Sequence, residues 1–280
     1  DVNGKLINFK DAYTTHVIKK VKNYKGEEVA FGNFDAHGWQ YKGPINVNGT
    51  WTNTANNVAG MQWAPDVIYN KTMVDEADLG SWDLMWNEKY ADDILMFDNS
   101  RDAIGIGLKM LGYSYNTTDE AQIKEAVDLL IEQKPLVQAY VMDEVFGKME
   151  GGNAAVGTYY YGDYLTMVEN NPDLGFYIPE EGTNVYVDAM CILKGAKNKE
   201  NAEAFINYMC STEAGLKNCE EIWYSTPLMS VREELDPEVS GDVYAYPDET
   251  VMAKCESYAG LPQNILDLYD SEWTRLKSAT

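Results

Sequence analysis

The feature that most constrains the fold of this chain is an alternation of short apolar runs with helical stretches after about residue 60. Residues 94–98 form an apolar run that ends in polar residues, which is typical of a buried strand. Residues 102–111 have helical spacing and stop before Gly112, and Pro135 ends the helix that follows. Residues 151–156 then lead to a further strand. The order strand, helix, helix, strand predicts an α/β lobe.

Three further helices or helix ends have sequence signals of their own. Thr117, with Glu120 three residues later, has the form of a capping box for the second helix. Residues 199–210 predict an amphipathic helix whose apolar stripe, which includes Phe205, faces the core. Residues 264–277 predict a final helix.

The length of the chain predicts two lobes. With 280 residues and 45% apolar side chains, the chain can form two lobes that each have a core. No low-complexity linker or internal repeat separates them, so we expect the lobes to be interwoven. The expected first lobe comprises residues 1–67 and 188–232, and the expected second lobe comprises residues 68–187 and 233–280. Residues 1–60 contain short β-like pieces and a turn signal at Asn48-Gly49, but no recognisable motif.

The charge of the chain is strongly unbalanced. It has 45 acidic and 22 basic side chains and a net charge of −23. A surface this acidic repels phosphate backbones and argues against a nucleic-acid partner. The charge serves solubility alone, or it also concentrates a cationic ligand near the protein. No apolar run approaches the length of about 18 residues that a membrane span needs. We therefore expect a cytosolic protein or the mature form of an extracytoplasmic one.

Neither the cysteines nor the histidines form a known catalytic or metal-binding pattern. The four cysteines, at positions 191, 210, 219 and 255, are spaced unlike zinc or thioredoxin motifs, so free thiols or one disulfide are expected. His16 and His37 are the two histidines, and no nucleophile elbow, P-loop or dinucleotide fingerprint occurs. Paired carboxylates for glycoside hydrolysis carry little weight among 45 acids. We therefore expect no enzyme and no bound metal.

Acidic residues stand beside aromatic residues in three apolar segments. Residues 98–102 follow the first segment, residues 159–163 end the second, and Asp188 lies within the third. A carboxylate on an apolar strand is costly to bury unless a positive group meets it. For Asp188 that group is an internal lysine or helix N-terminus, or it is the ammonium of a ligand. The tyrosines at 159–161 either pack in a core or line a site. The occurrence of acidic beside aromatic residues in all three segments favours a ligand site.

Four stretches, taken in order, resemble one family of transport proteins. They are residues 98–119 with Arg101-Asp102, residues 149–163 with Tyr159-Tyr160-Tyr161, residues 187–199 with Val187-Asp188, and residues 224–248 with Tyr224-Ser225-Thr226-Pro227. Over about residues 60–280 the chain resembles the spermidine/putrescine-binding proteins of ABC transporters. The resemblance implies an α/β, two-lobed type II periplasmic-binding-protein fold with strands that cross between the lobes at a hinge.

The same resemblance implies a function and a location. It implies a solute-binding protein that captures polyamines in an acidic, aromatic cleft between the lobes and delivers them to an ABC permease. The location would be the periplasm or the cell surface, with the membrane reached only through a lipoprotein anchor or the permease, and no cofactor is implied. An alkyl diammonium needs aromatic faces along its methylenes and a carboxylate at each end.

Matching by position assigns the ligand-binding residues. The resemblance implies that Asp102 and Asp188 bind amine groups and that Tyr160 and Tyr186 lie along the polyamine chain. Asn99 stands where well-known relatives have a further acid. The full expected set is Asp102, Tyr160, Tyr186, Asp188, Asn99, Trp63 and Asp163.

The N-terminal stretch departs from the family pattern. Residues 1–60 lack the aromatic-rich loop and the serine-tyrosine loop with which relatives complete the first lobe. The aromatic candidates in this stretch are Phe34, Trp39, Tyr41 and Trp51. We expect an incomplete first lobe, and therefore weaker binding or a site that another chain completes.

Two other functions fit part of the pattern. Adjacent tyrosines bind ferric iron through phenolates, so residues 159–161 admit an iron-binding protein, although this accounts less well for Asp188. A carboxylate-based carbohydrate-active enzyme would turn over its substrate rather than bind it stoichiometrically. Asn48, Asn70 and Asn116 each begin an N-x-Thr sequon. Because the family that the chain resembles looks bacterial, we interpret these sequons as chance matches.

Overall fold

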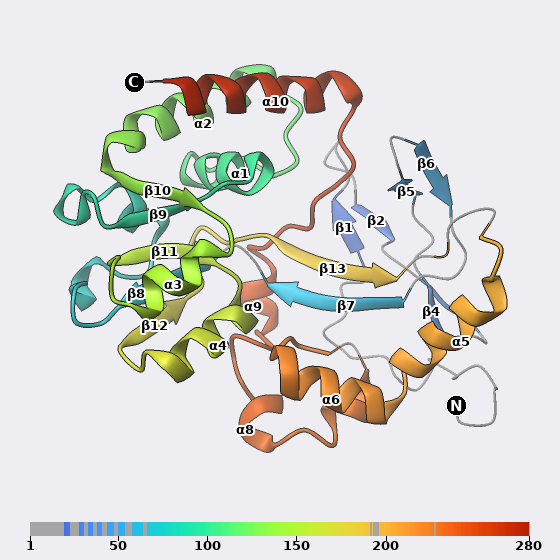
Figure 1. Cartoon of the computed structure of the whole chain (residues 1–280). Coiled ribbons are helices and arrows are strands. Elements are labelled where there is room, and N and C mark those ends of the chain that lie inside the picture. The colour runs from blue at the N-terminus through green and yellow to red at the C-terminus, as the bar shows by residue number, and fades with distance from the viewer. Residues whose placement is uncertain are drawn as a thin grey trace. The chain divides into compact units, whose positions relative to one another are not determined.

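The computed structural model of the chain describes residues 66–190, 192, 196–226 and 228–279, together with the backbone of strands between residues 20 and 63. The side chains of residues 186–189 and 249 lie outside the description. The chain divides into two compact units (Figure 1). Unit 2 contains Trp63–Val185 and Glu249–Thr280, and unit 1 contains Tyr186–Asp248 and most of the chain before Trp63. The lobe boundaries expected from the sequence stay a prediction, because compact units are not by themselves folding domains.

Unit 2 is built on a five-stranded sheet with the strand order β10-β9-β11-β8-β12. The strands are β8 (Asp66–Asn70), β9 (Ile94–Phe97), β10 (Val137–Val141), β11 (Val156–Tyr159) and β12 (Leu174–Tyr177). β9 runs parallel to β10 and β11, whereas β8 runs antiparallel to β11 and β12. Every residue of β9, β11 and β12 is buried, as expected for strands that are covered on both faces.

The helices of unit 2 cover both faces of this sheet. They are α1 (Ser100–Met110), α2 (Glu120–Gln133), α3 (Glu144–Glu150), α4 (Tyr161–Asn170) and α10 (Gln263–Ser278). The short helix α9 (Glu249–Met252) also belongs to unit 2. Crossovers between parallel strands are right-handed. The chain moves across the sheet one way from β9 to β10 and the other way from β10 to β11 and then β12. The helices of these connections therefore lie on opposite faces, with α1, α2 and α10 on one side and α3 and α4 on the other (Figure 1).

Side-chain caps set the ends of α1 and α2. The Asn99 side chain accepts hydrogen bonds from two backbone N–H groups of the first turn of α1. Gly112, with φ of 74°, follows the end of α1 as expected. The expectation that Thr117 caps α2 is wrong: Asp119 is the cap, and it accepts a hydrogen bond from the backbone N–H of Ala121 at 2.8 Å. A carboxylate directly before the helix reaches that N–H, whereas Thr117 lies further from the first turn.

The core of unit 2 lies between the sheet and its helices. The apolar residues of β9 are fully buried, and because side chains alternate between the two faces of a strand, they contribute to the packing on both sides of the sheet. The helices α1 and α2 present buried stripes to one of these sides. The fully buried members of these two stripes are Ile104, Ile106, Leu108, Ile123, Val127 and Leu130. Gln133 is the last residue of α2, and Pro135 lies within the short 3₁₀ turn that follows, so the predicted helix end is confirmed. The predicted final helix is also confirmed, as α10.

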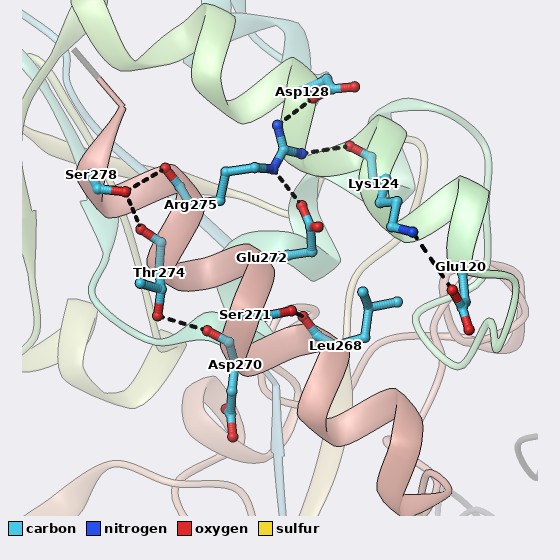
Figure 2. Close-up of polar contacts among 10 residues, drawn as sticks. All are labelled: Glu120, Lys124, Asp128, Leu268, Asp270, Ser271, Glu272, Thr274, Arg275 and Ser278. Atoms are coloured by element: carbon cyan, nitrogen blue, oxygen red, sulfur yellow. Dashed lines mark hydrogen bonds and ion pairs between the residues drawn. The ribbon is translucent and has the colours of Figure 1, made fainter.

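Arg275 ties α10 to α2 (Figure 2). Its Nη1 lies 2.7 Å from Oδ1 of Asp128 in α2, and its Nε lies 2.6 Å from Oε2 of Glu272. Its Nη2 donates a hydrogen bond of 3.4 Å to the carbonyl oxygen of Lys124. One guanidinium thus bridges two carboxylates and a carbonyl from two helices, which gives the contact a fixed geometry.

Lys277 holds the last turn of α10 against the edge of the sheet. Its Nζ lies 2.8 Å from Oδ1 of Asp98, which follows β9. The same Nζ lies 4.4 Å from the ring centroid of Tyr140 in β10 and 5.4 Å from that of Trp273. An alkyl ammonium between a carboxylate and two ring faces combines an ion pair with cation–π contacts.

In the residues that the structure describes, unit 1 contains short paired strands and four helices. Its strands are β1 (Lys20–Lys22), β2 (Glu28–Ala30), β3 (Asn33–Asp35), β4 (Gly38–Gln40), β5 (Pro44–Val47), β6 (Thr50–Asn53), β7 (Val58–Trp63) and β13 (Val185–Met190). The pairs β1-β2, β3-β4 and β5-β6 are antiparallel, and β7 pairs with β13. The boundary between the units falls within β7 and again within β13. The predicted turn at Asn48-Gly49 and the aromatic candidates before residue 60 lie outside the described residues or side chains.

The helices of unit 1 are α5 (Lys199–Met209), α6 (Thr212–Ile222), α7 (Met229–Arg232) and α8 (Pro237–Ser240). A small core of Cys219, Leu228 and Val231 joins α6 to α7. The expectation that the apolar stripe of residues 199–210 faces a core is wrong for Phe205, which is 60% exposed. Helical periodicity fixes which residues share a face, but it does not fix whether another element covers that face.

The remaining short elements are the 3₁₀ turns η2 (Glu76–Asp78), η3 (Trp82–Trp86), η4 (Glu88–Tyr90) and η5 (Lys134–Leu136). Ser81 caps η3, and its side chain accepts a hydrogen bond from the backbone N–H of Asp83. Across the part of the chain that the structure describes, no helix has the length and apolar character needed to span a bilayer.

Two of the three sequon asparagines are buried. Asn70 is 4% exposed and Asn116 is 3% exposed, while Asn48 lies outside the description. The Asn70 Oδ1 accepts hydrogen bonds from the backbone N–H and the hydroxyl of Thr72. A glycan requires a side chain that protrudes into solvent, so Asn70 and Asn116 do not fit as surface glycosylation sites.

We predict that Arg275→Ala lowers the free energy of unfolding by about 1 kcal/mol, because it removes two partly exposed charged contacts at once. Lys124→Ala is the control, because Lys124 makes an exposed helical pair with Glu120 at 3.6 Å, and we expect no measurable change. Urea unfolding followed by circular dichroism measures both variants. Equal stability of the two variants would show that the Arg275 bridge does not stabilise the packing of α10.

Candidate functional site

The candidate site lies at one edge of the unit 2 sheet. Because β9 and β11 are parallel neighbours, their C-terminal ends meet at the same edge. β8 begins at this edge, with Asp66 opposite Tyr159 in the register. Open α/β sheets bind ligands beyond the C-terminal ends of their strands. α1 and α4 also begin here, directly after β9 and β11.

Aromatic side chains from three elements gather at this edge. We define the edge aromatic cluster as Phe97, Phe146, Tyr159 and Tyr160. The Phe97 ring centroid lies 5.6 Å from that of Tyr159 and 5.5 Å from that of Tyr160, and the two tyrosine centroids are 4.7 Å apart. Phe146 of α3 meets Tyr159 edge-on at 5.8 Å. Ring faces attract cations and cover methylene groups, so this cluster suits an alkyl ammonium.

The start of α1 adds an acid to the same edge. The Asn99 Oδ1 accepts hydrogen bonds from the backbone N–H groups of Arg101 at 2.9 Å and Asp102 at 3.4 Å. This cap places Asp102 in the first turn of α1. A negative charge is favourable at a helix N-terminus because the backbone N–H groups there are not used within the helix.

Asp102 is a buried acid with a raised pKa. Its side chain is 6% exposed, and its Oδ1 accepts a 2.7 Å hydrogen bond from the Tyr258 hydroxyl. Burial raises the pKa of Asp102, while the hydrogen bond from Tyr258 and the charge of Arg101 oppose this shift. Removal from water makes the ionised form costly, so an approaching cation would gain more here than at the surface.

Asp66 is a second buried acid, at the start of β8. Its side chain is fully buried, and burial raises its pKa well above the usual range, with only the Thr183 hydroxyl opposing the shift. Neither carboxyl oxygen has a hydrogen-bonding partner within 3.5 Å, so the Thr183 contact is a weak one. Asp66 is therefore a neutral, protonated carboxyl over a wider pH range than an exposed aspartate.

Comparison with known proteins identifies the family. A family model described as a bacterial extracellular solute-binding protein matches residues 20–254. The chain belongs to this family. Two relatives are named spermidine/putrescine-binding periplasmic proteins. The one from Salmonella typhimurium is 31% identical over 69% of this chain and 56% of its own length, and the one from Escherichia coli is 30% identical over 77% and 62%. The chain thus spans less than two thirds of the length of these relatives.

Solved structures give the same family and the fold. The substrate-binding protein PotD of a spermidine/putrescine ABC transporter from Streptococcus pneumoniae is 30% identical, with a TM-score of 0.74 over 99% of this chain and 76% of that one. A putative spermidine/putrescine ABC transporter protein from Listeria monocytogenes is 34% identical, with a TM-score of 0.72 over 79% and 68%. The predicted α/β class and type II periplasmic-binding-protein fold of this solute-binding protein are confirmed.

The structure places four of the predicted site residues in two groups. Asn99 and Asp102 lie together at the start of α1. Tyr160 precedes the first residue of α4, and Asp163 lies in the first turn of α4. The two groups are joined by the edge aromatic cluster, because Tyr160 packs on Phe97, which lies two residues before Asn99. Their contact with a ligand stays a prediction.

The other three predicted residues are described only by their backbone. Trp63 is the last residue of β7, and Tyr186 and Asp188 lie in β13, which pairs with β7. Tyr186 and Asp188 are separated by one residue in β13. Their roles in the solute-binding protein stay predictions.

Two residues of the site were not predicted from the sequence. Asp66 interrupts an apolar stretch much as Asp188 does, so the same criterion would have found it. Tyr258 lies in a stretch without periodicity or motif, and its contact with Asp102 joins residues 156 positions apart. Such a long-range contact leaves no local signal in the sequence.

The tyrosines at 159–161 do not favour ferric iron. The Tyr159 hydroxyl donates a 2.9 Å hydrogen bond to Asp143, and burial raises the pKa of Tyr159, which opposes the phenolate form that iron needs. Tyr161 packs instead against Phe176, with ring centroids 4.7 Å apart. Within the described residues, no group of three His, Cys, Asp or Glu side chains could hold a metal ion.

We predict that Asp66→Asn becomes more stabilising, relative to the native chain, as the pH rises from about 4. An acid whose pKa is raised by folding favours the protonated native state, so native stability falls as the pH rises from the unfolded pKa toward the folded pKa. The asparagine variant does not titrate and escapes this loss. Urea unfolding between pH 4 and pH 8 measures the difference. Asp173→Asn, at an exposed position, is the control, and parallel curves for all three proteins would contradict the prediction.

Proposed function

We propose that this solute-binding protein binds aliphatic polyamines outside the cytoplasm and delivers them, unchanged, to an ABC permease. The observation that carries the proposal is the buried carboxylate of Asp102 in the first turn of α1, which begins at the same edge of the sheet as the edge aromatic cluster. The names of the relatives support the same ligand class, since several are spermidine/putrescine- or putrescine-binding periplasmic proteins. The permease partner and the extracytoplasmic location rest on the family and on these relatives.

The chemistry of the edge fits an alkyl ammonium. Each primary ammonium of a polyamine donates up to three hydrogen bonds, and a desolvated carboxylate such as that of Asp102 is a strong acceptor for them. The methylene chain between the ammonium groups is apolar and packs on ring faces such as that of Tyr160. Each cation–π contact contributes on the order of 1 kcal/mol. We assign Asn99 and Asp163 to the margin of this site.

A second acid is needed for the other end of the ligand. Asp188 fills this role in the proposal, with Tyr186 two residues before it in β13 and with Trp63 at the end of the paired strand β7. A carboxylate that meets the second ammonium group would neutralise a charge that is costly to remove from water.

The proposed protein is a binding protein and not an enzyme. A polyamine held by two carboxylates and aromatic faces undergoes no bond change, and the family is one of substrate-binding transport proteins. The carbohydrate-active alternative draws no support from the relatives named above. Excess negative charge on the chain, −23 in total, favours the approach of a cationic ligand.

Titration calorimetry of the full chain with putrescine and spermidine tests the proposal, with glucose, glycine and ferric citrate as comparison ligands. We predict one-to-one binding of a polyamine and a loss of about 2 to 5 kcal/mol of binding free energy in Asp102→Asn, because the ligand ammonium then has no charged partner. Asp98→Asn is the matched control. Asp98 is a nearby acid that pairs with Lys277, and we expect its replacement to leave binding unchanged.

The pH dependence gives a second readout of the same experiment. Because the pKa of Asp102 is raised, we expect polyamine affinity to fall as the pH decreases through that pKa, where the carboxylate becomes protonated. A flat response to both polyamines, with a clear response to another ligand, would overturn the proposed ligand class.

We predict that Asp188→Asn also weakens polyamine binding by about 2 to 5 kcal/mol while the chain stays folded. The alternative interpretation, an internal ion pair, predicts the opposite combination: unchanged affinity and reduced stability. Calorimetry and urea unfolding of the same variant distinguish the two. Unchanged affinity in a folded variant would assign the partner of Asp188 to the protein itself.

A further inference from the structure

Residues 255–259, which we call the return segment, lie against the helix α1 and the turn that follows it. The chain re-enters unit 2 at α9, and the return segment lies between α9 and α10. Its backbone is tied to the start of β13 and the residues just before it: the N–H of Glu256 donates to the carbonyl of Thr183 at 3.0 Å, and the N–H of Val185 donates to the carbonyl of Glu256 at 2.9 Å. These bonds fix one end of the return segment.

Asn116 fixes the return segment on both sides of Tyr258. The Asn116 Nδ2 donates a 2.8 Å hydrogen bond to the carbonyl of Ser257, and its Oδ1 accepts a 2.7 Å hydrogen bond from the N–H of Ala259. The Arg101 Nη2 also donates to this Oδ1, at 3.2 Å. Asn116 is 3% exposed, so water does not compete for these bonds. One side chain therefore holds the peptide groups that flank Tyr258.

A buried ion pair holds the residue two positions earlier. Lys109 of α1 places its Nζ 2.6 Å from Oε1 of Glu256, and both side chains are nearly buried. The Ser114 hydroxyl donates a hydrogen bond to the other carboxylate oxygen of Glu256. Replacing one partner of such a pair leaves an uncompensated charge, which makes the position of Glu256 strongly specified.

Tyr258 is thereby held over Asp102. Its hydroxyl lies 2.7 Å from Oδ1 of Asp102 and 3.2 Å from the carbonyl oxygen of Arg101, and the shorter contact to the carboxylate is the favourable one for its single proton. The Arg101 guanidinium lies over its ring at 4.8 Å, and Tyr115 meets the ring edge-on at 5.6 Å. Because Arg101 and Tyr115 both contact the Tyr258 ring, the orientation of the ring and of its hydroxyl is fixed.

We infer that Tyr258 is a positioning residue that orients the Asp102 carboxylate for a ligand ammonium, and that Asn116 acts through Tyr258. The inference rests on the proposed function, in which Asp102 binds that ammonium. Because the Tyr258 hydroxyl holds Oδ1, the carboxylate cannot rotate freely, and it presents its other oxygen to the ligand in one direction. The Asp102 side chain then loses less conformational freedom when the ligand binds.

The ionisation of Asp102 reports this contact. Among the described residues, the titratable or charged groups that face Asp102 are Arg101 of α1, Tyr115 of the turn after α1, and Tyr258 of the return segment. A hydrogen bond from Tyr258 lowers the pKa of Asp102 against the effect of burial. Loss of the hydroxyl should therefore make Asp102 harder to ionise.

Carbon-13 NMR of the Asp102 carboxyl group, assigned with Asp102→Asn, tests the inference without a ligand. In Tyr258→Phe we expect the titration midpoint of Asp102 to rise by about one pH unit. Tyr269→Phe is the matched control: its ring also lies over the Arg101 guanidinium, at 5.2 Å, but its buried hydroxyl has no hydrogen-bonding partner in the structure. We expect the midpoint of Asp102 to be unchanged in this variant.

Putrescine calorimetry across the same pH range tests the role in binding. In Tyr258→Phe we expect the pH at which affinity falls to move upward with the Asp102 midpoint. At a pH below both midpoints, the affinity of the variant for putrescine should be lower than that of the native chain. The difference should be about tenfold for each pH unit by which the Asp102 midpoint has risen. Asn116→Ala should move the midpoint in the same direction. The double variant with Tyr258→Phe should move it no further, because both changes act through one contact.

The outcomes separate the two proposals. An Asp102 midpoint that is unchanged in Tyr258→Phe overturns the positioning role, even if polyamines bind the native chain. Absence of putrescine and spermidine binding to the native chain overturns the proposed function, while the NMR titration still decides whether Tyr258 holds Asp102. Additive changes in the double variant would contradict the link from Asn116 to Tyr258. Tyr258→Phe keeps the packed ring, so this variant alone tests the positioning role if Asn116→Ala does not fold.

Discussion

The rest of unit 2 depends on the complete burial of β9 between two parallel neighbours. Its four apolar residues have no exposed face, and its backbone is hydrogen-bonded to β10 on one side and to β11 on the other. Parallel strands require crossovers, and right-handed crossovers place helices on both faces. The first polar residues after such a strand emerge at the C-terminal edge, together with those that follow β11. The site residues gather at one edge because the strands before them, β9 and β11, run parallel.

The acids at this edge are used in different ways. Asp98 is partly exposed and pairs with Lys277, whose ammonium also lies over two aromatic rings. Asp102 is buried and receives a hydroxyl proton from Tyr258. Asp66 is buried deeper still, without a close partner. Asp98 thus has a protein cation as its partner and stays in contact with water, Asp102 has a hydroxyl donor, and Asp66 has no close partner. The acid with the hydroxyl donor, Asp102, is the one suited to receive a cation from outside.

Much of the fold and some of the site could be predicted from the sequence. The buried strand β9, the glycine after α1 and the proline after α2 are local features, and local sequence determines them. The position of Asp102 followed from its place after an apolar run and from the family resemblance. Tyr258 could not be predicted, because only the folded chain brings it to Asp102. Phe205 was misjudged because periodicity defines an apolar face but not its covering.

The buried amide of Asn116 has a consequence for how the protein is made. Asn116 begins an N-x-Thr sequon, yet in the folded chain its Nδ2 is bonded to the carbonyl of Ser257 and its Oδ1 to the N–H of Ala259. In a eukaryotic secretory host, an oligosaccharide could be attached there only before residues 255–259 had closed over α1. The attached sugar would then keep that closure from forming, because it replaces one Nδ2 hydrogen and the buried position of Asn116 has no space for it. Glycan occupancy at this position would thus mark chains that had been modified before folding and could not complete it.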